Sequence, residues 1–502
     1  MAETKSYDLI VIGGGPGGYT GAIRAAQLGK KVAIVERDKL GGTCLNWGCI
    51  PTKALLAGAE LYHKLTHERE EFGISAENIS FDWSKVIARS RKVAGNLNAG
   101  VGFLMKKNKI DHYDGHALIS KAAAGSPKTV EVYDLNDAEP TGEVGTNGVE
   151  KFKFGGEAKV VLNAPKVMVA TGASPRPMPG SAFDGDKIIS SKEAMLLEER
   201  PEKLLIVGSG AIGMEFAYVY NAYGTEVTIV EMLDRLVPIE DTDVSKAMLK
   251  AYKKLGIKVM TKNIVKSVEK TDKGIKALIS AVDDESKTQE LEADKVLVAI
   301  GVQGRFDGLF DESITIEIDR GHIKTATDYK LAGATYETNV PGIYAIGDVI
   351  GPPWLAHVAG EEAVLAVERM YGHDAPDVNY NAIPGCTYCS PQIASVGFTE
   401  QYCKENDIAY TTAKFPFQVS GKAQALNETQ GFIKLIVGEE HQEVLGAHMV
   451  GEGVTEMIAE MGLAITLEAT AEEIVATMHA HPTLSEAVHE SALGINNRMI
   501  NF

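Results

Sequence analysis

The sequence is poor in cysteine, in aromatic residues and in positive charge. Only 5 of its 502 residues are cysteines, which argues against a disulfide-stapled secreted scaffold; any bonded pair is expected to be catalytic. Lys and Arg number 50 against 68 Asp and Glu, and the resulting net charge of −18 argues against a general nucleic-acid-binding surface. The 45% hydrophobic and 24% charged residues are typical of a globular protein, and the length suggests about three domains.

The sequence also lacks a long hydrophobic run. No apolar stretch approaches the roughly 18 residues that a transmembrane helix needs. The first residues lead directly into the short apolar run 9–12, without the charged segment, apolar core and cleavage site of a signal peptide. We therefore expect a soluble, cytoplasmic protein that binds neither membranes nor nucleic acid.

The sequence does contain two similar segments, 7–36 and 203–231. Each has a short apolar run, a G-x-G-x-x-G turn, a helix-like stretch and a second apolar run that ends in Glu. This order is typical of a dinucleotide-binding βαβ unit, in which the glycines shape the turn below a pyrophosphate and the Glu binds a ribose diol. The expected cofactor-binding residues are Gly13, Gly15, Gly18 and Glu36 in the first segment, and Gly208, Gly210, Gly213 and Glu231 in the second.

Two dinucleotide sites in one chain predict FAD and a nicotinamide nucleotide as cofactors. A carboxylate at Glu231 would bind a free 2′-hydroxyl and repel a 2′-phosphate, so the nicotinamide nucleotide is expected to be NAD rather than NADP. Arg235 lies nearby in the sequence but is a poor candidate for a phosphate-binding position.

Two cysteines lie in the segment 41–53, directly after the first repeat. Pro51 suits the first turn of a helix, which places Cys49 near a helix N-terminus, where a thiolate is stabilised. A thiolate at Cys44 or Cys49 could attack a disulfide or donate electron density to a flavin. The alternatives are two inert cysteines or an adventitious metal pair, but no further Cys or His at zinc-like spacing lies nearby, and we predict no metal site.

Residues 41–53 resemble the redox-active motif of the pyridine nucleotide-disulfide oxidoreductases. Further segments resemble motifs of this family, in the right order and over nearly the whole chain. Residues 170–174 resemble the turn near the flavin nucleotide, 338–348 the second FAD motif, and 355–357 the segment near the isoalloxazine ring. Residues 479–486 resemble the signature of the family's dihydrolipoyl dehydrogenases.

The resemblance implies a role for each matching residue. Cys44 and Cys49 would form the redox disulfide, with Cys44 exchanging with substrate and Cys49 contacting the flavin. His481 would be the base and Glu486 the carboxylate that orients it, which also suits the titration range of histidine. Lys53 and Glu215 would form an ion pair beside the flavin. The further cofactor-binding residues that the resemblance implies are Ala117, Thr171, Gly172, Ala173, Val265, Gly301, Asp348 and Ala356, together with Lys53.

The resemblance also implies a fold and partners. We expect an α/β protein with two Rossmann-like domains, for FAD and NAD, and a C-terminal α+β dimerisation domain. The expected boundaries are 1–188 and 303–380 for the FAD-binding and central parts, 189–302 for the NAD-binding domain and 381–502 for the dimerisation domain.

The implied reaction oxidises protein-bound dihydrolipoamide and reduces NAD⁺. The implied assembly is a homodimer whose His–Glu pair comes from the partner subunit. It would serve a lipoyl-bearing acyltransferase or lipoyl carrier protein of a 2-oxoacid dehydrogenase or glycine cleavage complex. No lipoyl domain is recognised before residue 7, so the lipoyl group is expected on another protein.

Some residues depart from the family pattern or test its alternatives. Cys386 and Cys389 form an unusual C-x-x-C pair; strand residues three apart point to opposite faces, so two inert thiols are expected rather than a second redox or metal site. Arg305 follows Gly301 later than the family's usual arginine.

Glutathione reductase is disfavoured by Glu231, mercuric reductase by a C-terminus without cysteines, and the soluble transhydrogenase by the cysteine pair. A flavoprotein scaffold without turnover is disfavoured by the complete cysteine, histidine and glutamate set.

Overall fold

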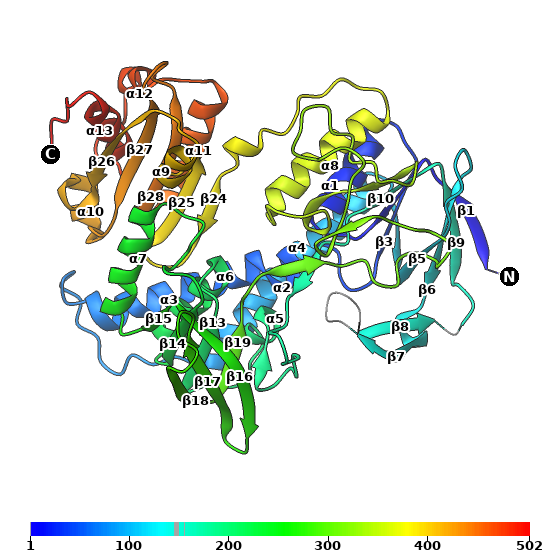
Figure 1. Ribbon diagram of the computed structural model, residues 1–502, viewed down its shortest axis with the longest axis horizontal. Coiled ribbons are helices and arrows are strands. Elements are labelled where there is room, and N and C mark those ends of the chain that lie inside the picture. The colour runs from blue at the N-terminus through cyan, green and yellow to red at the C-terminus, as the bar shows by residue number, and fades with distance from the viewer. Residues whose placement is uncertain (1, 145–149, 155) are drawn as a thin grey trace. The chain divides into compact units, whose positions relative to one another are not determined.

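The computed structural model describes residues 2–144, 150–154 and 156–502 (Figure 1). They form two compact units. Unit 1 comprises Met1–Ala54, Ile87–Met178 and Gly301–Val378, and unit 2 comprises Leu55–Val86, Pro179–Ile300 and Asn379–Phe502. This division does not test the domain boundaries expected at residues 188, 302 and 380, which stay predictions.

Unit 1 is built on a five-stranded parallel sheet of order β23-β10-β2-β3-β4. Its central strands are buried on both faces, which explains their continuous apolar sequence. Helix α1 (Pro16–Gln27) packs against helix α8 (Ala356–Met370), as Figure 1 shows. The strands are β2 (Leu9–Ile12), β3 (Val32–Glu36), β4 (Asp111–Asp114), β10 (Lys166–Val169) and β23 (Ile343–Ala345).

A second sheet completes unit 1, with order β1-β9-β6-β5. The 25-residue helix α4 (Trp83–Lys107) precedes β4 and ends in the paired lysines of its last turn. The strands of the second sheet are β1 (Glu3–Ser6), β5 (His116–Lys121), β6 (Lys128–Tyr133) and β9 (Val160–Ala164). Smaller elements are α2 (Gly42–Trp47), the pair β11 (Ala173–Pro175) and β20 (Val302–Gly304), the pair β21 (Ile318–Asp319) and β22 (His322–Ile323), and the hairpin β7 (Ala138–Val144) and β8 (Glu150–Phe154).

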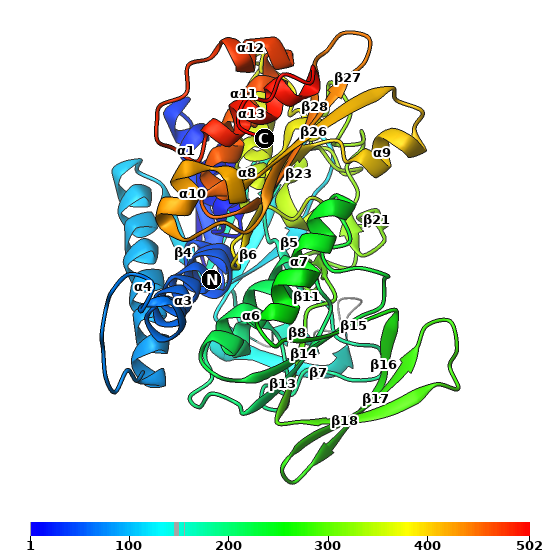
Figure 2. The ribbon, with the colours of Figure 1, turned by 90° about the vertical axis from the view of Figure 1, so that its left-hand side faces the viewer.

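Unit 2 repeats the first parallel sheet in its strand order, β12-β19-β13-β14-β15. The internal repeat predicted from the sequence is therefore a repeat of two βαβ units with matching neighbours. The strands are β12 (Ile188–Ile189), β13 (Lys203–Val207), β14 (Glu226–Glu231), β15 (Lys258–Thr261) and β19 (Lys295–Val298). The helices are α5 (Ser191–Ala194), α6 (Ala211–Ala222) and α7 (Thr242–Lys254). A three-stranded sheet follows (Figure 2), with β16 (Asn263–Thr271), β17 (Gly274–Ala281) and β18 (Thr288–Ala293).

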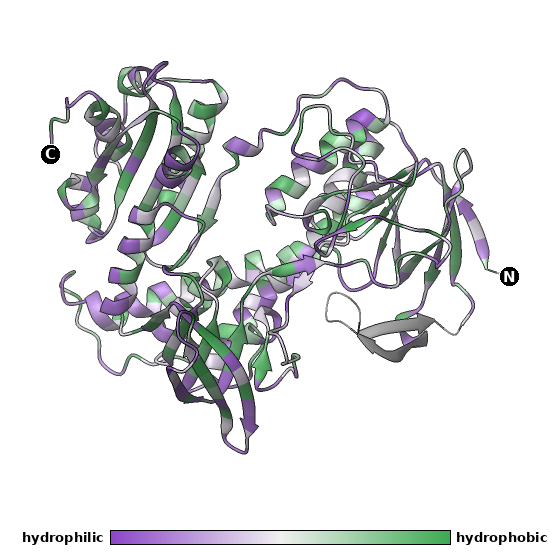
Figure 3. Ribbon diagram, in the orientation of Figure 1, coloured by the Kyte–Doolittle hydropathy of each residue, from purple (hydrophilic) through white to green (hydrophobic). Residues whose placement is uncertain are grey.

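The C-terminal part of unit 2 is an antiparallel sheet of order β24-β25-β28-β27-β26. Its central strands are hydrophobic along most of their length (Figure 3), and helices α11 and α13 pack on them. The strands are β24 (Gly385–Thr387), β25 (Gln392–Gly397), β26 (Tyr410–Pro416), β27 (Phe432–Gly438) and β28 (Val444–Gly451). The helices are α9 (Glu400–Glu405), α10 (Gly421–Leu426), α11 (Val454–Thr466), α12 (Ala471–Ala476) and α13 (Glu486–Ile495).

Within the described residues, no helix has both the length and the apolar character that crossing a membrane requires.

Lys434, on β27, is a buried cation that links this sheet to α7. Its side chain is 3% exposed and its ammonium contacts carboxylate oxygens of Asp241 at 2.9 Å, Asp243 at 3.2 Å and Glu400 at 2.6 Å. Burial opposes the ionisation of Asp241, but hydrogen bonds from Lys434 and from two backbone N–H groups outweigh it and lower the pKa of that carboxyl. The network therefore holds the start of α7 against the sheet.

Replacing Lys434 with Met should destabilise the protein strongly. The substitution removes the cation but leaves Asp241, whose side chain is fully buried, charged and without its ion-pair partner. Breaking a buried pair in this way costs about 3–5 kcal/mol, and urea denaturation would measure the loss. Lys414→Met is the matched control, because the Lys414 side chain is 49% exposed and an exposed pair contributes about 1 kcal/mol or less. Equal effects of the two substitutions would contradict this interpretation.

Candidate active site

The two βαβ units form the same glycine turn between strand and helix. Gly13 has a φ of +103° and Gly208 a φ of +100°, in the left-handed region that favours glycine. A Cβ added to Gly18 would lie 1.8 Å from the Gly13 oxygen, and one added to Gly213 would lie 2.1 Å from the Gly208 oxygen. These positions require glycine so that the helix can approach the strand.

The helices that follow these turns begin with N–H groups that no side chain caps. Gly15 is the N-cap of α1 and Gly210 the N-cap of α6, and in the described chain neither end has a side-chain cap or an acidic residue in its first turn. A Cβ added to Gly210 would meet nothing within 4 Å, so open space lies over that helix end. Uncapped N–H groups and the helix dipole suit a pyrophosphate, and the residues therefore fit two dinucleotides.

Glu36 and Glu231, the last residues of β3 and β14, have carboxylates that backbone N–H groups hold in matching ways. In the second unit, Glu231 accepts hydrogen bonds from the Ser209 N–H at 2.9 Å and from the Leu233 N–H at 2.8 Å, one to each oxygen. Glu36 accepts two equivalent bonds, at 2.6 and 2.8 Å. Glu231 Oε2 also accepts the Ser209 hydroxyl at 2.7 Å, so Glu231 Oε1 and both Glu36 oxygens keep acceptor capacity for a ribose hydroxyl. Arg235, in contrast, donates to the Pro238 carbonyl.

Several residues expected to bind FAD lie in unit 1, and two of them, Thr171 and Asp348, have polar groups that suit a ligand. The Thr171 hydroxyl is buried and has no hydrogen-bond partner among the described residues. Burial raises the pKa of Asp348 to about 6, so this carboxyl would gain from a hydroxyl donor such as that of the ribitol chain. These residues fit a polar flavin nucleotide. Nearby expected positions are the buried Ala117 and Ala173, Gly172 with a φ of +70°, and Ala356 at the start of α8.

The remaining two expected nucleotide-binding positions lie around the second repeat. Val265 is buried on β16. Gly301 follows β19, has a φ of +110°, and would meet nothing within 4 Å if it carried a Cβ. Gly301 is also the first residue of the last segment of unit 1.

The redox cysteines belong to unit 1 and lie on consecutive helices. Cys44 is on α2, and Cys49 is the first residue of α3 (Cys49–His63), the place that Pro51 predicts. The Cys44 thiol lies beside Cys49; hydrogen bonding with Cys49, together with burial, raises the pKa of Cys44, while the charge of Lys53 opposes that shift. Cys49 is the more exposed of the two. Cys44 is therefore partly buried and Cys49 exposed, and the charge of Lys53 acts on the Cys44 thiol.

His481 and Glu486 form a hydrogen-bonded pair in unit 2. His481 Nδ1 lies 2.8 Å from Glu486 Oε1, and Glu486 Oε2 accepts the Thr483 N–H at 2.8 Å. Burial opposes the ionisation of Glu486, but these bonds outweigh it and lower the pKa of its carboxyl. The carboxylate holds Nδ1–H and leaves Nε2 as the nitrogen that can accept a proton. The His481 side chain is 79% exposed, so Nε2 can meet a second molecule.

His479 has a different environment from His481. Its side chain is buried, and its ring nitrogens contact Glu460 and the Thr477 carbonyl at 2.9 Å each. These contacts suit a structural role for His479. Glu215, also in unit 2, is buried and accepts the Tyr388 N–H at 3.0 Å.

The site residues divide between the two units. Cys44, Cys49 and Lys53 belong to unit 1, whereas Glu215, His481 and Glu486 belong to unit 2. The Lys53–Glu215 pair and the action of His481 on the cysteines therefore stay predictions.

The second cysteine pair shows separate contacts for its two thiols. Cys386 donates to the Thr455 carbonyl at 4.0 Å, and the buried Cys389 donates to the Pro391 carbonyl at 3.4 Å. These contacts support the expectation of two inert thiols.

Sequence reasoning missed the part played by two arginines of unit 1. The Arg305 side chain donates from Nε to the Ser174 hydroxyl at 2.8 Å, and its backbone N–H donates to the Gly172 carbonyl at 2.9 Å. These bonds connect the end of β20 to the turn expected near the flavin nucleotide. Burial and the nearby charge of Arg37 lower the pKa of Arg305 to about 10. Two neighbouring guanidinium groups next to Glu36 could bind an anionic part of a cofactor. The only sequence signal was the shifted position of Arg305.

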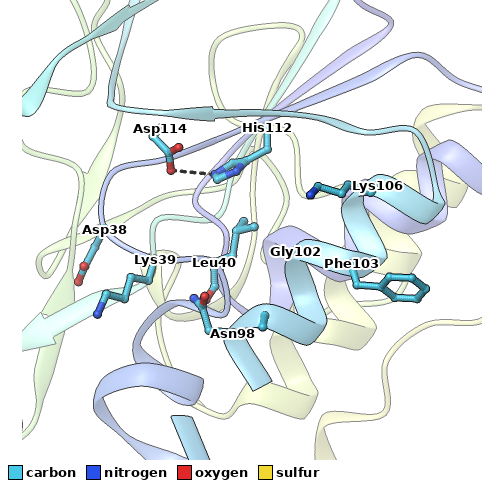
Figure 4. Close-up of a pocket in the computed structure, with 10 residues that line it drawn as sticks. Asp38, Lys39, Leu40, Asn98, Gly102, Phe103, Lys106, His112 and Asp114 are labelled. Carbon is cyan, nitrogen blue, oxygen red and sulfur yellow. Dashed lines mark hydrogen bonds and ion pairs between the residues drawn. The ribbon is translucent and has the colours of Figure 1, made fainter. Parts of the chain in front are cut away.

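A pocket of about 500 Å³ lies beside this region, between the loop after β3, helix α4 and β4 (Figure 4). His112 and Asp114 form an ion pair of 3.3 Å on its wall. None of the predicted site residues lines it. The lining residues are Asp38, Lys39, Leu40, Asn98, Ala99, Gly102, Phe103, Lys106, His112 and Asp114.

Comparison with known families agrees with this site. Residues 7–363 match the model of the pyridine nucleotide-disulphide oxidoreductases, and residues 383–492 match their dimerisation domain. The chain belongs to this family. The predicted fold class is confirmed, and so are FAD and NAD as the cofactors that family membership implies. The dimerisation domain supports the predicted homodimer.

Known relatives are similar over their whole length. The chain is 43% identical to a dihydrolipoyl dehydrogenase of Rhizobium etli, with 100% of both chains covered, and 41% identical to one of Bacillus subtilis, with 99% of both covered. The solved structure of LpdA from Mycobacterium tuberculosis has a TM-score of 0.83 at 25% identity and covers 97% of this chain and 99% of its own. These similarities confirm the resemblance stated from the sequence motifs.

Proposed function

We propose that this protein is a dihydrolipoyl dehydrogenase, which oxidises protein-bound dihydrolipoamide to lipoamide and reduces NAD⁺ to NADH. The observation that carries the proposal is the His481–Glu486 pair, because a dithiol substrate needs a base that removes a thiol proton. The adjacent thiols of Cys44 and Cys49 supply the matching disulfide chemistry. The full-length similarity to two proteins of that name supports the substrate class.

The chain's own residues perform the thiol–disulfide exchange. His481 Nε2 takes the proton of one substrate thiol, and the thiolate attacks Cys44 of the Cys44–Cys49 disulfide, which releases Cys49 as a thiolate. The second substrate thiol then attacks the substrate sulfur of the mixed disulfide, so that lipoamide leaves with a closed disulfide, and the proton of this second thiol passes to the released Cys44 thiolate. Glu486 holds the ring in place through Nδ1 during these steps.

The cofactors are bound by the two glycine turns. FAD, when bound, would supply the two-electron chemistry that connects the Cys44–Cys49 dithiol with NAD⁺. The first turn, Glu36, Thr171 and Asp348 would hold FAD, and the second turn with Glu231 would hold NAD. Lys53 would place a cation near the flavin, and Glu215 would hold that cation in place.

The partners and location complete the proposal. A homodimer would supply each Cys44–Cys49 pair with His481 and Glu486 of the other subunit. The substrate would be a lipoyl-bearing acyltransferase or lipoyl carrier protein of a 2-oxoacid dehydrogenase or glycine cleavage complex, in the cytoplasm.

Substrate and nucleotide preference test the proposal together. The holoenzyme should form NADH from dihydrolipoamide and NAD⁺, and should show little activity with reduced glutathione. Because the Glu231 carboxylate would face the 2′-phosphate, kcat/KM for NADP⁺ should fall below that for NAD⁺ by about 100-fold or more, equivalent to about 2.7 kcal/mol. Glu231→Ala should narrow this ratio, and Glu226→Ala, on the exposed start of the same strand, is the matched control. Comparable wild-type values for the two nucleotides would refute the role of Glu231.

A further inference from the structure

The glycine turn of the second βαβ unit contains a serine whose hydroxyl points into the protein. Ser209 lies between Gly208 and Gly210, where β13 passes into α6, and it is fully buried. Its hydroxyl donates to Glu231 Oε2 at 2.7 Å, and its backbone N–H donates to the same oxygen at 2.9 Å. A fully buried hydroxyl has no surface for a nucleotide, so an effect of Ser209 on binding would be exerted through Glu231.

The first βαβ unit has the same arrangement without the hydroxyl. Its turn has Gly14 in the place of Ser209, and the Gly14 N–H donates to Glu36 Oε2 at 2.6 Å. A Cβ added to Gly14 would lie 2.9 Å from Leu40 Cδ2, so the packing there leaves little room for a side chain. Among the described residues, Glu36 is held by backbone N–H groups alone, whereas Glu231 is also held by a side-chain hydroxyl.

The hydroxyl decides which part of the Glu231 carboxylate remains available. A carboxylate oxygen has about two positions for hydrogen-bond donors, and Glu231 Oε2 uses both of them for Ser209. Oε1 accepts one bond, from the Leu233 N–H at 2.8 Å, and keeps one position for a ligand. The three bonds together oppose rotation of the carboxylate. Glu231 therefore offers a single acceptor position with a fixed direction.

A fixed carboxylate of this kind discriminates between a hydroxyl and a phosphate. In dinucleotide-binding βαβ units, the carboxylate at this place binds the 2′-hydroxyl of the ribose. An acceptor that is oriented before binding lowers the ordering cost of binding a 2′-hydroxyl. A 2′-phosphate, in contrast, meets a negative charge that hydrogen bonds prevent from turning away, which is a repulsive contribution to specificity.

We infer that Ser209 is a positioning residue that sets the preference of this site for a nicotinamide nucleotide with a free 2′-hydroxyl. It acts by holding Glu231, and the inference rests on the proposed binding of NAD at the second glycine turn. The 3′-hydroxyl is common to NAD⁺ and NADP⁺, so the ratio of their affinities reports the interaction at the 2′ position. Without the Ser209 hydroxyl the carboxylate turns more easily, and the preference for NAD⁺ should fall.

Equilibrium binding of NAD⁺ and NADP⁺ to the oxidised holoenzyme, measured by calorimetry, tests this inference without turnover. Ser209→Gly copies the turn of the first unit, and Ser209→Ala removes only the hydroxyl. Each should lower the preference for NAD⁺ over NADP⁺ by about 10-fold, the usual effect of one hydrogen bond to a charged group. Ser245→Ala is the matched control, because Ser245 is a buried serine on α7 whose hydroxyl has no hydrogen-bond partner among the described residues.

A double-mutant cycle separates positioning from a general effect on the fold. Glu231→Ala should lower the preference for NAD⁺ more than Ser209→Gly does. Adding Ser209→Gly to Glu231→Ala should lower it no further, because the hydroxyl acts through the carboxylate. Additive effects would overturn the inference. So would Ser209 variants that change the preference no more than Ser245→Ala does, or that weaken the binding of NAD⁺ and NADP⁺ by the same factor.

The outcomes distinguish this inference from the proposed function. A preference that Glu231→Ala leaves unchanged would refute the role of Glu231 itself, and the inference with it. A preference that Glu231→Ala lowers but both Ser209 variants leave unchanged would refute only the part assigned to Ser209. Dihydrolipoamide takes no part in these measurements, so failure of the proposed substrate would leave their results unaffected.

Discussion

His481→Gln should lower dihydrolipoamide oxidation by roughly 10²–10⁴-fold, the usual contribution of a positioned acid–base group. Nδ1 of His481 is held by Glu486, which leaves Nε2 to take the substrate proton, and Gln cannot replace a titrating nitrogen. Reduction of the flavin by NADH should persist, because hydride transfer does not need this base. Steady-state kinetics measure dihydrolipoamide oxidation, and anaerobic flavin reduction by NADH measures the other half-reaction. The control variant for both measurements is His441→Gln. Loss of both dihydrolipoamide oxidation and flavin reduction by NADH would show a structural rather than an acid–base role for His481.

The same substitution tests whether two subunits share each site. A heterodimer of Cys44→Ser and His481→Gln subunits would contain one site with an intact Cys44–Cys49 pair and an intact His481 from the other subunit. About half of the sites should then be active, although each parent homodimer is inactive. If each subunit uses its own histidine, every site in the heterodimer carries one lesion, and verified heterodimers should show no recovery.

Cys44→Ser and Cys49→Ser should each abolish dihydrolipoamide oxidation, because neither variant can form the disulfide. The two variants should differ in their spectra. Cys44→Ser leaves Cys49, at the start of α3, as a thiolate expected next to the oxidised flavin, and a long-wavelength charge-transfer absorbance should appear. Cys49→Ser should lack this absorbance.

Absorbance spectra of the two purified holoenzymes settle the roles of the sulfurs. Cys403→Ser is the control, since Cys403 is buried on α9 and has no part in the proposed exchange. A charge-transfer band in both variants, or in neither, would show that the assignment of Cys44 to substrate and Cys49 to flavin is wrong.

The repeated nucleotide-binding units could be predicted from sequence because their chemistry is local. Gly13 and Gly18 are required by backbone conformation and close approach within one turn, and Glu36 follows at a fixed place at the end of the next strand. The same local constraints recur around Gly208 and Glu231, so each segment supports the assignment of the other as a nucleotide-binding unit. Cys49 at the start of α3 was predictable for the same reason, since Pro51 marks the first turn.

Features that depend on distant contacts were not predictable in this way. Lys434 is an ordinary strand lysine in the sequence, and only the tertiary fold places it among the carboxylates of Asp241, Asp243 and Glu400. Arg305 is close to Arg37 only after β20 has paired with β11. The π-helix Lys64–Glu68, which directly follows α3, also has no clear sequence signal, because the sequence of these residues would equally suit a continued α-helix.

The measurement that tests the central claim most directly is anaerobic titration of the oxidised holoenzyme with dihydrolipoamide. We expect about one equivalent per subunit to open the Cys44–Cys49 disulfide, with a change in the flavin spectrum that NAD⁺ reverses as NADH forms. His481→Gln should slow the first of these changes without altering its stoichiometry. A flavin that NADH reduces but dihydrolipoamide leaves unchanged would contradict the account, because the cysteines and the His481–Glu486 pair would then serve a different disulfide substrate or no turnover at all.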